Sequence, residues 1–175
     1  MKGLIQRSFE YLDKPTFNKL YKSLIRPQIE YANVVWHPLY KGQMRELEKV
    51  QRRSTKLVPT LKKKPYKERL QELDIPSIQY RQLRNDLIQA YTIINNIDNI
   101  QCNEFFTFVE DDRTRNSTLK LFKPYARTNI RSNYFSHRVV DHWNGLSETT
   151  KLSKNLNEFK MKVDRDLIDI RFDFI

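Results

Sequence analysis

The chain has 175 residues, of which 39% are hydrophobic and 30% are charged, and its 32 basic and 21 acidic residues give a formal net charge of +11. We expect one domain, or one domain with a smaller appendage. The apolar runs are too short to span a bilayer, no signal peptide opens the chain, and the single cysteine (Cys102) excludes an internal disulfide, so we expect an intracellular protein of the nucleus or cytoplasm with no membrane partner.

The first predicted helix begins near Pro15, because proline is favoured in a first helical turn. Four residues then follow the spacing of one helical face: Phe17, Leu20, Tyr21 and Leu24. Pro27 is expected to interrupt this helix and to restart it, because the residue before a proline disfavours the α conformation. A second apolar stripe is expected to run on until His37-Pro38: Ile29, Ala32, Val35 and Trp36.

The most informative predicted element is a helix from about Gln43 to Val58. Four apolar residues mark its expected buried side: Met44, Leu47, Val50 and Leu57. Five basic residues at offsets 0, 4, 7, 8 and 11 form one continuous stripe: Arg45, Lys49, Arg52, Arg53 and Lys56. Like charges four residues apart repel one another on an isolated helix, so the stripe indicates a partner of opposite charge, although a solvated helix surface is the alternative.

The basic excess continues beyond this helix. Between Lys41 and Arg84 there are 13 basic residues and 5 acidic ones, which is a net charge of +8. This stretch contains Lys62, Lys63 and Lys64 in a predicted loop, and Arg81 and Arg84 in the following long helix. A localised excess of this kind attracts polyanions, of which RNA and DNA are the commonest.

The remaining pattern predicts a mainly α fold, a helical bundle with a small β-hairpin or loop insertion and a C-terminal helix. Helices are expected at 66–73, 77–95, 132–144 and 153–167, the last capped by Ser153, and short strands at 118–122 and 128–130. The tail from Ile168 is either a strand or a frayed end. The expected domains are 1–100, an insertion at 101–131, and a C-terminal helical segment at 132–175 that packs on the first domain.

The sequence shows no catalytic or metal-binding motif. The three histidines (His37, His137 and His142) and Cys102 do not have zinc-ligand spacing. The acidic doublet Asp111-Asp112 lies in a polar stretch, and we interpret it as a loop. We therefore expect no catalytic residue, no metal and no cofactor.

Several segments of the chain form a recognisable series. They include SLIRPQIEYA at residues 23–32, LEKVQRRSTK at 47–56, YKERLQEL at 66–73, RQLRNDL at 81–87, RTR at 113–115, FSHRVV at 135–140 and WNGL at 143–146. Together these segments resemble the region beyond the palm in reverse transcriptases of Jockey-like non-LTR retrotransposons. They occur in the family's order and cover nearly the whole chain. The resemblance places the fingers, the palm and the catalytic aspartates upstream of this chain, with Met1 inside the first thumb helix.

The resemblance implies a thumb that clamps a template–primer duplex of RNA or DNA. It assigns phosphate contacts to Arg45, Lys49, Arg52, Arg53 and Lys56, with Lys62, Lys63, Lys64, Arg81 and Arg84 as outer contacts. Four aromatic residues are expected in the core: Tyr21, Tyr31, Trp36 and Trp143. Arg113 and Arg115 remain open between RNA binding and loop capping. The alternative function is a helical protein-interaction module, or a relic fragment, whose exposed apolar face docks a palm domain or another protein.

Overall fold

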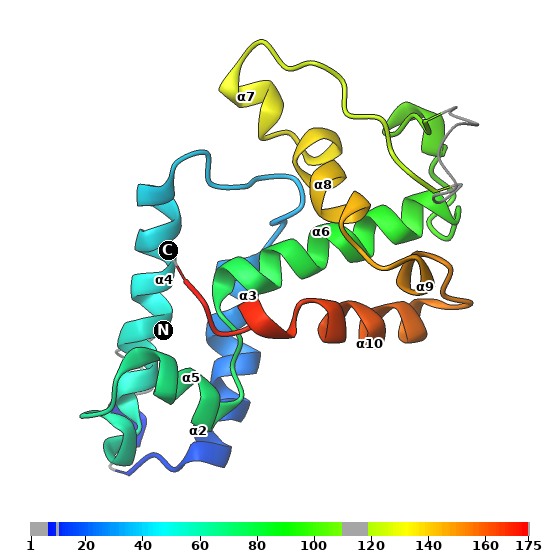
Figure 1. The fold of residues 1–175 in the computed structure, drawn as a ribbon. Helices are drawn as coiled ribbons and strands as arrows, with labels where there is room; N and C mark the ends of the chain where they lie inside the picture. Colours follow the sequence, from blue (N-terminus) through cyan, green and yellow to red (C-terminus); the bar gives the residue numbers. More distant parts are fainter. Residues whose placement is uncertain (1–6, 10, 110–118, 175) are drawn as a thin grey trace. The chain divides into compact units, whose positions relative to one another are not determined.

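The computed structural model describes residues 7–9, 11–109 and 119–174, and these are mainly helical (Figure 1), which confirms the expected helical bundle. The chain divides into two compact units. Unit 1 consists of Met1–Asn33, Tyr40–Gln82 and Asp169–Ile175, and unit 2 of Val34–Leu39 and Leu83–Ile168. The domain boundary expected after residue 100 therefore falls inside unit 2.

Unit 1 is built from short helices around one hydrophobic core. Its elements are α2 (Lys14–Leu20), a π-helical segment (Tyr21–Ile25), α3 (Arg26–Glu30), α4 (Lys41–Ser54), 3-10 turns (Thr55–Leu57 and Pro59–Leu61) and α5 (Tyr66–Leu73). Helix α6 (Ile78–Ile94) contributes its first turn to unit 1 and its remainder to unit 2. The core includes Phe17, Leu70 and Ile78, which are completely buried.

The N-terminal helical run continues through Pro27. Asp13 caps α2 by accepting a hydrogen bond of 3.2 Å from the Thr16 amide. Pro27 lies in the first turn of α3, so a helix restarts there as predicted, but no break separates α3 from the preceding run. Proline cannot donate the usual backbone bond, and the π-helical segment just before it, in which the Arg26 amide bonds the Tyr21 carbonyl, accommodates this loss.

The prediction of an apolar helical stripe that reaches His37 is wrong. Helix α3 ends at Glu30, and Ala32 has a positive φ of 50°, which a continuing α-helix does not permit. The side chains of this segment are therefore turned outward, with Tyr31 78%, Val35 85% and Trp36 40% exposed. The expectation that Tyr31 and Trp36 are core residues was wrong, whereas Tyr21 and Trp143 are buried as predicted.

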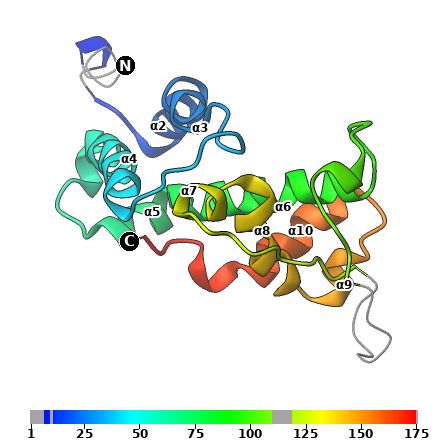
Figure 2. The ribbon, with the colours of Figure 1, turned by 90° about the horizontal axis from the view of Figure 1, so that it is seen from above.

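Unit 2 places helices on two sides of the second half of α6 (Figures 1 and 2). Its further elements are a 3-10 turn (Cys102–Glu104), α7 (Asn129–Ser132), α8 (Phe135–Asn144), α9 (Glu148–Lys151) and α10 (Leu156–Asp166). The core joins α6, α8 and α10. The Tyr91 and Phe159 rings stack with centroids 4.2 Å apart, and the Trp143 ring lies 6.0 Å from Phe159.

The predicted hairpin is not confirmed within the described part of the insertion. There, β structure consists of an isolated antiparallel bridge between Phe108 and Leu121, and Thr118 lies outside the described residues. Thr128 does not begin a strand. Its hydroxyl accepts a bond from the Arg131 amide and caps α7. The last helix is capped by Asn155 and not by Ser153.

The C-terminal tail returns to unit 1 as a 3-10 turn (Ile168–Ile170) followed by an irregular segment. It is neither the strand nor the frayed end that the sequence left open. Phe172 and Phe174 pack against the core of unit 1, and the Ser77 amide donates to the Arg171 carbonyl at 3.0 Å. Lys67 pairs with Asp173 at 2.7 Å. Side chains close to the chain end therefore take part in building unit 1.

Candidate nucleic-acid interface

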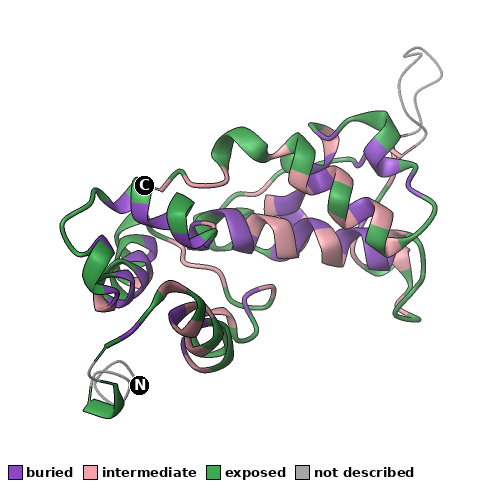
Figure 3. Cartoon of the chain, turned by 90° about the horizontal axis from the view of Figure 1, so that it is seen from below, coloured by how far each residue is buried: buried purple, intermediate pink, exposed green. Residues whose placement is uncertain are grey.

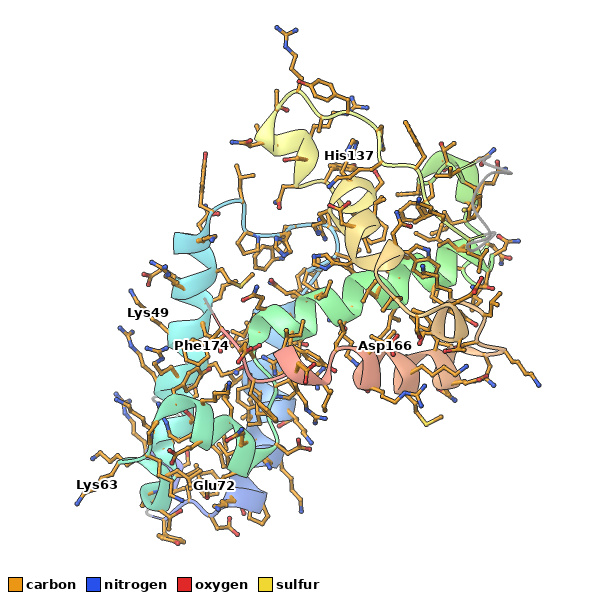
Figure 4. The ribbon with its side chains drawn as sticks, viewed as in Figure 1. Lys49, Lys63, Glu72, His137, Asp166 and Phe174 are labelled. Carbon is orange, nitrogen blue, oxygen red and sulfur yellow. The ribbon has the colours of Figure 1, made fainter. Side chains whose placement is uncertain are left out.

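The exposed side of α4 and the turn that follows carries the predicted basic stripe. We call Arg45, Lys49, Arg52, Arg53 and Lys56 the basic face; all five residues are exposed. At 100° per residue they lie within about 100° of one another around the helix, and they span about 16 Å along its axis. Lys62 and Lys63 in the next loop are exposed too, and Lys49 and Lys63 project away from the ribbon in Figure 4.

A buried polar network on the opposite side fixes the rotation of α4. Glu48 is only 4% exposed; its carboxylate accepts a bond of 3.0 Å from the Ile78 amide and a second from the Tyr66 hydroxyl. Gln51 is completely buried and donates to the Pro76 carbonyl at 3.1 Å. Because these bonds hold one face of α4 inward, they turn the basic face outward.

Sequence reasoning missed this network. The predicted buried side of α4 was apolar, yet Val50 is 44% exposed, and the fully buried positions besides Met44 are polar: Glu48, Gln51, Ser54 and Thr55. Their spacing of three or four residues is that of one helical face. That signal was available, but a polar stripe on a helix normally indicates solvent.

The basic face contains one position held by aromatic rings. The Arg52 guanidinium lies 4.8 Å from the centroid of Tyr66 and 5.0 Å from that of Phe174. Those two rings meet edge to face at 4.9 Å. Arg52 is therefore positioned by α5 and the C-terminal tail, and it lines a hollow of about 290 Å³ together with Arg45, Glu48 and Lys49.

Carboxylates reduce the effective charge at two of the predicted positions. Lys49 pairs with Glu46 at 2.5 Å, and both side chains are at least half exposed, so solvent screens this pair strongly. Lys64 pairs with Glu72, which also binds Lys14 at 2.5 Å. The two lysines hold the pKa of Glu72 below its usual value. Lys62 and Lys63 are thus better placed than Lys64 to contact a phosphate.

Arg81 does not fit its predicted role as a nucleic-acid contact. It is 4% exposed, its Nε lies 2.8 Å from Oε1 of Glu30, and its Nη2 donates to Gln51 at 2.6 Å. Its charge is used inside unit 1. Arg84 is partly buried and binds Asp164 through two nitrogens, so its guanidinium is also engaged within the protein. We therefore leave both residues out of the interface.

Two segments that carry the family resemblance meet in unit 2. Arg138, from the segment at 135–140, donates two bonds of 2.8 Å to the carboxylate of Asp86, from the segment at 81–87. Arg138 also donates to the Val34 carbonyl at 2.8 Å. Arg138 and Asp86 therefore have a structural role within unit 2. Asp111-Asp112, Arg113 and Arg115 lie outside the described residues.

The buried carboxylate behind the basic face predicts a specific pH dependence of stability. Burial raises the pKa of Glu48 above its usual value of 4.5. Between 4.5 and the raised value the folded protein keeps a proton that the unfolded chain releases, so the free energy of unfolding falls as the pH rises through that window. Glu48→Gln has no proton to lose, and its melting temperature should vary less with pH over this window.

The comparison is a series of thermal melts of the two proteins between about pH 4 and pH 8. The control is Glu46→Gln on the same helix, whose side chain is 68% exposed and which should keep the wild-type profile. If the melting temperatures of Glu48→Gln and the wild type change with pH in parallel, folding does not raise the pKa of the Glu48 carboxyl group.

Among the residues that the structure describes, no three His, Cys, Asp or Glu side chains gather where they would hold a metal ion. No helix in the described ranges is long and apolar enough to cross a membrane. No protein-family model, curated protein or solved structure matches the chain.

Proposed function

We propose that the chain is a non-catalytic nucleic-acid-binding module, corresponding to the thumb and C-terminal region of a Jockey-like reverse transcriptase, which holds a template–primer duplex by its phosphates. The observation that carries the proposal is the basic face. Its five cations are exposed on one side of α4 and the turn that follows, while the carboxylate of Glu48 is buried and accepts hydrogen bonds from Ile78 and Tyr66.

The chemistry of the face suits a phosphate backbone. Arginine binds phosphate oxygens through two parallel N–H bonds, and lysine acts as a mobile point charge. A face about 16 Å long meets several phosphates of a duplex, which carries one charge per about 1.7 Å of its axis. Contacts of this kind position a duplex without reading its base sequence. The face therefore predicts binding that depends on salt and tolerates any sequence.

A second candidate function follows from exposed aromatic residues in unit 1. Tyr11, Tyr31 and Tyr40 are 66%, 78% and 62% exposed. Aromatic residues are enriched where proteins bind one another. They favour a helical module that docks a palm domain or another protein. A stable complex with a protein, without affinity for RNA or DNA, would favour this candidate over the first.

The basic face predicts a steep and removable salt dependence. The logarithm of the association constant for an RNA–DNA duplex should fall linearly with the logarithm of salt, by about 0.9 for each contacted phosphate if the hybrid behaves as B-form DNA. A quadruple variant (Arg45→Gln, Lys49→Gln, Arg53→Gln, Lys56→Gln) should reduce this slope by about 3 to 4. Arg52 is kept because it packs on two rings. Fluorescence anisotropy at several salt concentrations measures the slope.

The matched control removes the same charge elsewhere. Lys19, Lys22, Lys154 and Arg165 are exposed, and replacing them with glutamine should leave the slope near its wild-type value. If the slope falls equally in the two quadruple variants, the salt dependence reflects the net charge of the protein and not the basic face. Absence of wild-type binding at low salt would remove the proposed function.

A further inference from the structure

Unit 2 contains a pocket that the proposed function does not use. It lies between α7 and the start of α8 and has a volume of about 450 Å³, within the 300–1,000 Å³ typical of small-ligand sites. Its lining residues combine hydroxyl, aromatic, cationic and imidazole groups: Thr128, Ile130, Arg131, Tyr134, Ser136 and His137. This mixture suits a planar polar ligand better than a purely apolar one.

His137 gives the pocket an unused hydrogen-bonding group. The residue is 4% exposed, and its Nδ1 is buried without a hydrogen-bond partner among the described residues. Burial lowers the pKa of the imidazole, and Arg131 and Lys123 lower it further. His137 is therefore neutral at pH 7, with one ring nitrogen to donate and one to accept. A buried polar atom without a partner is rare and costly, so the imidazole of His137 has hydrogen-bonding capacity that the described residues do not use.

The rim of the pocket and the segment leading to it carry exposed rings and cations. Tyr134 is 64% exposed, Tyr125 87% and Phe122 54%. Arg127 and Arg131 are also exposed, and both lie between Tyr125 and Tyr134 in the sequence. Proteins that bind single-stranded nucleic acid combine these two features, because bases stack on aromatic faces while cations hold the backbone.

We propose that this pocket binds an unpaired base of a single-stranded nucleic acid. The base enters beside His137, whose imidazole hydrogen-bonds its edge, and stacks on the ring of Tyr134. Arg131 and Arg127 hold the phosphates on either side, and Tyr125 offers a stacking face to a neighbouring base. The site lies in a different unit from the basic face and takes a different form of nucleic acid, so it does not rest on the proposed function.

The test uses the full chain and two short fluorescent oligonucleotides that differ only in the 2′-hydroxyl, oligo(U) and oligo(dU), in the presence of excess unlabelled RNA–DNA duplex. Stacking of a base on an aromatic side chain contributes about 1–3 kcal/mol, so Tyr134→Ala should weaken binding by about 5-fold to 150-fold. Arg131→Gln should weaken binding and lower its salt dependence by about one contacted phosphate. Tighter binding of oligo(U) would show that the 2′-hydroxyl is also read, and equal binding that the base and phosphate suffice.

The matched control is Tyr11→Ala, because Tyr11 is 66% exposed and lies in unit 1. It should bind both oligonucleotides as the wild type does. A direct readout that needs no substitution is the imidazole nitrogen resonance of His137, which should shift when oligo(U) is added. The proposal is overturned if neither oligonucleotide binds, if Tyr134→Ala and Tyr11→Ala behave alike, or if the His137 resonance stays in place at saturation.

Discussion

Replacing Arg81 with methionine is expected to destabilise the protein by about 3–5 kcal/mol, as is typical when one partner of a buried ion pair is removed. Glu30 would lose the guanidinium that lies 2.8 Å from its carboxylate. The Tyr21 hydroxyl and the Gln51 amide oxygen would lose donors at 2.9 and 2.6 Å. All these groups lie in the interior of unit 1, where water does not easily replace a lost partner.

Urea unfolding followed by circular dichroism measures this effect, with Arg53→Met as the matched control. Arg53 is exposed on the basic face, and its replacement should change the free energy of unfolding by less than about 0.5 kcal/mol. In a double variant, Glu30→Gln should recover part of the loss caused by Arg81→Met, because the Glu30 carboxylate would otherwise be left with Arg26, at 2.9 Å, as its remaining ion-pair partner. A change below about 1 kcal/mol for Arg81→Met alone would show that the buried network does not hold unit 1 together.

The same pair of variants separates structure from binding. Arg53→Met should weaken duplex binding with little loss of stability, since its side chain faces solvent. Arg81→Met should do the reverse under conditions in which it remains folded. On sequence alone the two arginines had the same predicted role. Only the contacts of Arg81 with Glu30 and Gln51 distinguish them.

The helices were largely predictable because their apolar residues repeat at helical spacing. The predicted helix at 77–95 corresponds to α6, and the one at 66–73 matches α5. The basic stripe was predictable for the same reason, since charge and position are both read from sequence. Its exposure follows the prediction at all five positions of α4 and its following turn.

Other features depended on information that periodicity does not carry. Pro27 predicted a break, but a π-helical segment accommodates it within the helical run. The stripe through Val35 and Trp36 had suitable spacing, yet α3 ends at Glu30, and Tyr31, with a ψ of 125°, already leaves the helical conformation before these residues. The buried Glu48 and Gln51 were missed because their partners, Tyr66, Ile78 and Pro76, come from distant segments. Polar burial is decided by tertiary partners, which a local pattern does not show.

The pocket in unit 2 shows the same limit. The sequence presented His137 as an ordinary histidine, and no motif connected it with Tyr134 or Arg131. The short helix α7, capped by Thr128 where a strand was expected, brings these residues together. Their proximity therefore depends on a few local hydrogen bonds and on how firmly α8 is held in the core of unit 2.

Trp143 packs the end of α8 into the core of unit 2, and Trp143→Ala is expected to destabilise the protein by about 3–5 kcal/mol. The side chain is completely buried, its ring lies 6.0 Å from that of Phe159, and its Nε1 donates to the Leu119 carbonyl at 2.9 Å. Alanine would leave a cavity and an unpaired carbonyl. The neighbouring Asn144 exchanges two bonds of 2.9 Å with the backbone of Leu121, so loosening the end of α8 also loosens the segment leading to the pocket.

Trp36→Ala is the matched control, because Trp36 is 40% exposed and the same substitution should cost much less there. Hydrogen exchange should show lost protection in α8, α10 and the second half of α6 for Trp143→Ala, while the amides of α4 and α5 remain protected if unit 1 retains its own core. Oligo(U) binding should then fall while duplex binding persists. Equal loss of protection in both units would show that they unfold as one cooperative body, and Trp143→Ala would then affect the basic face as strongly as the pocket.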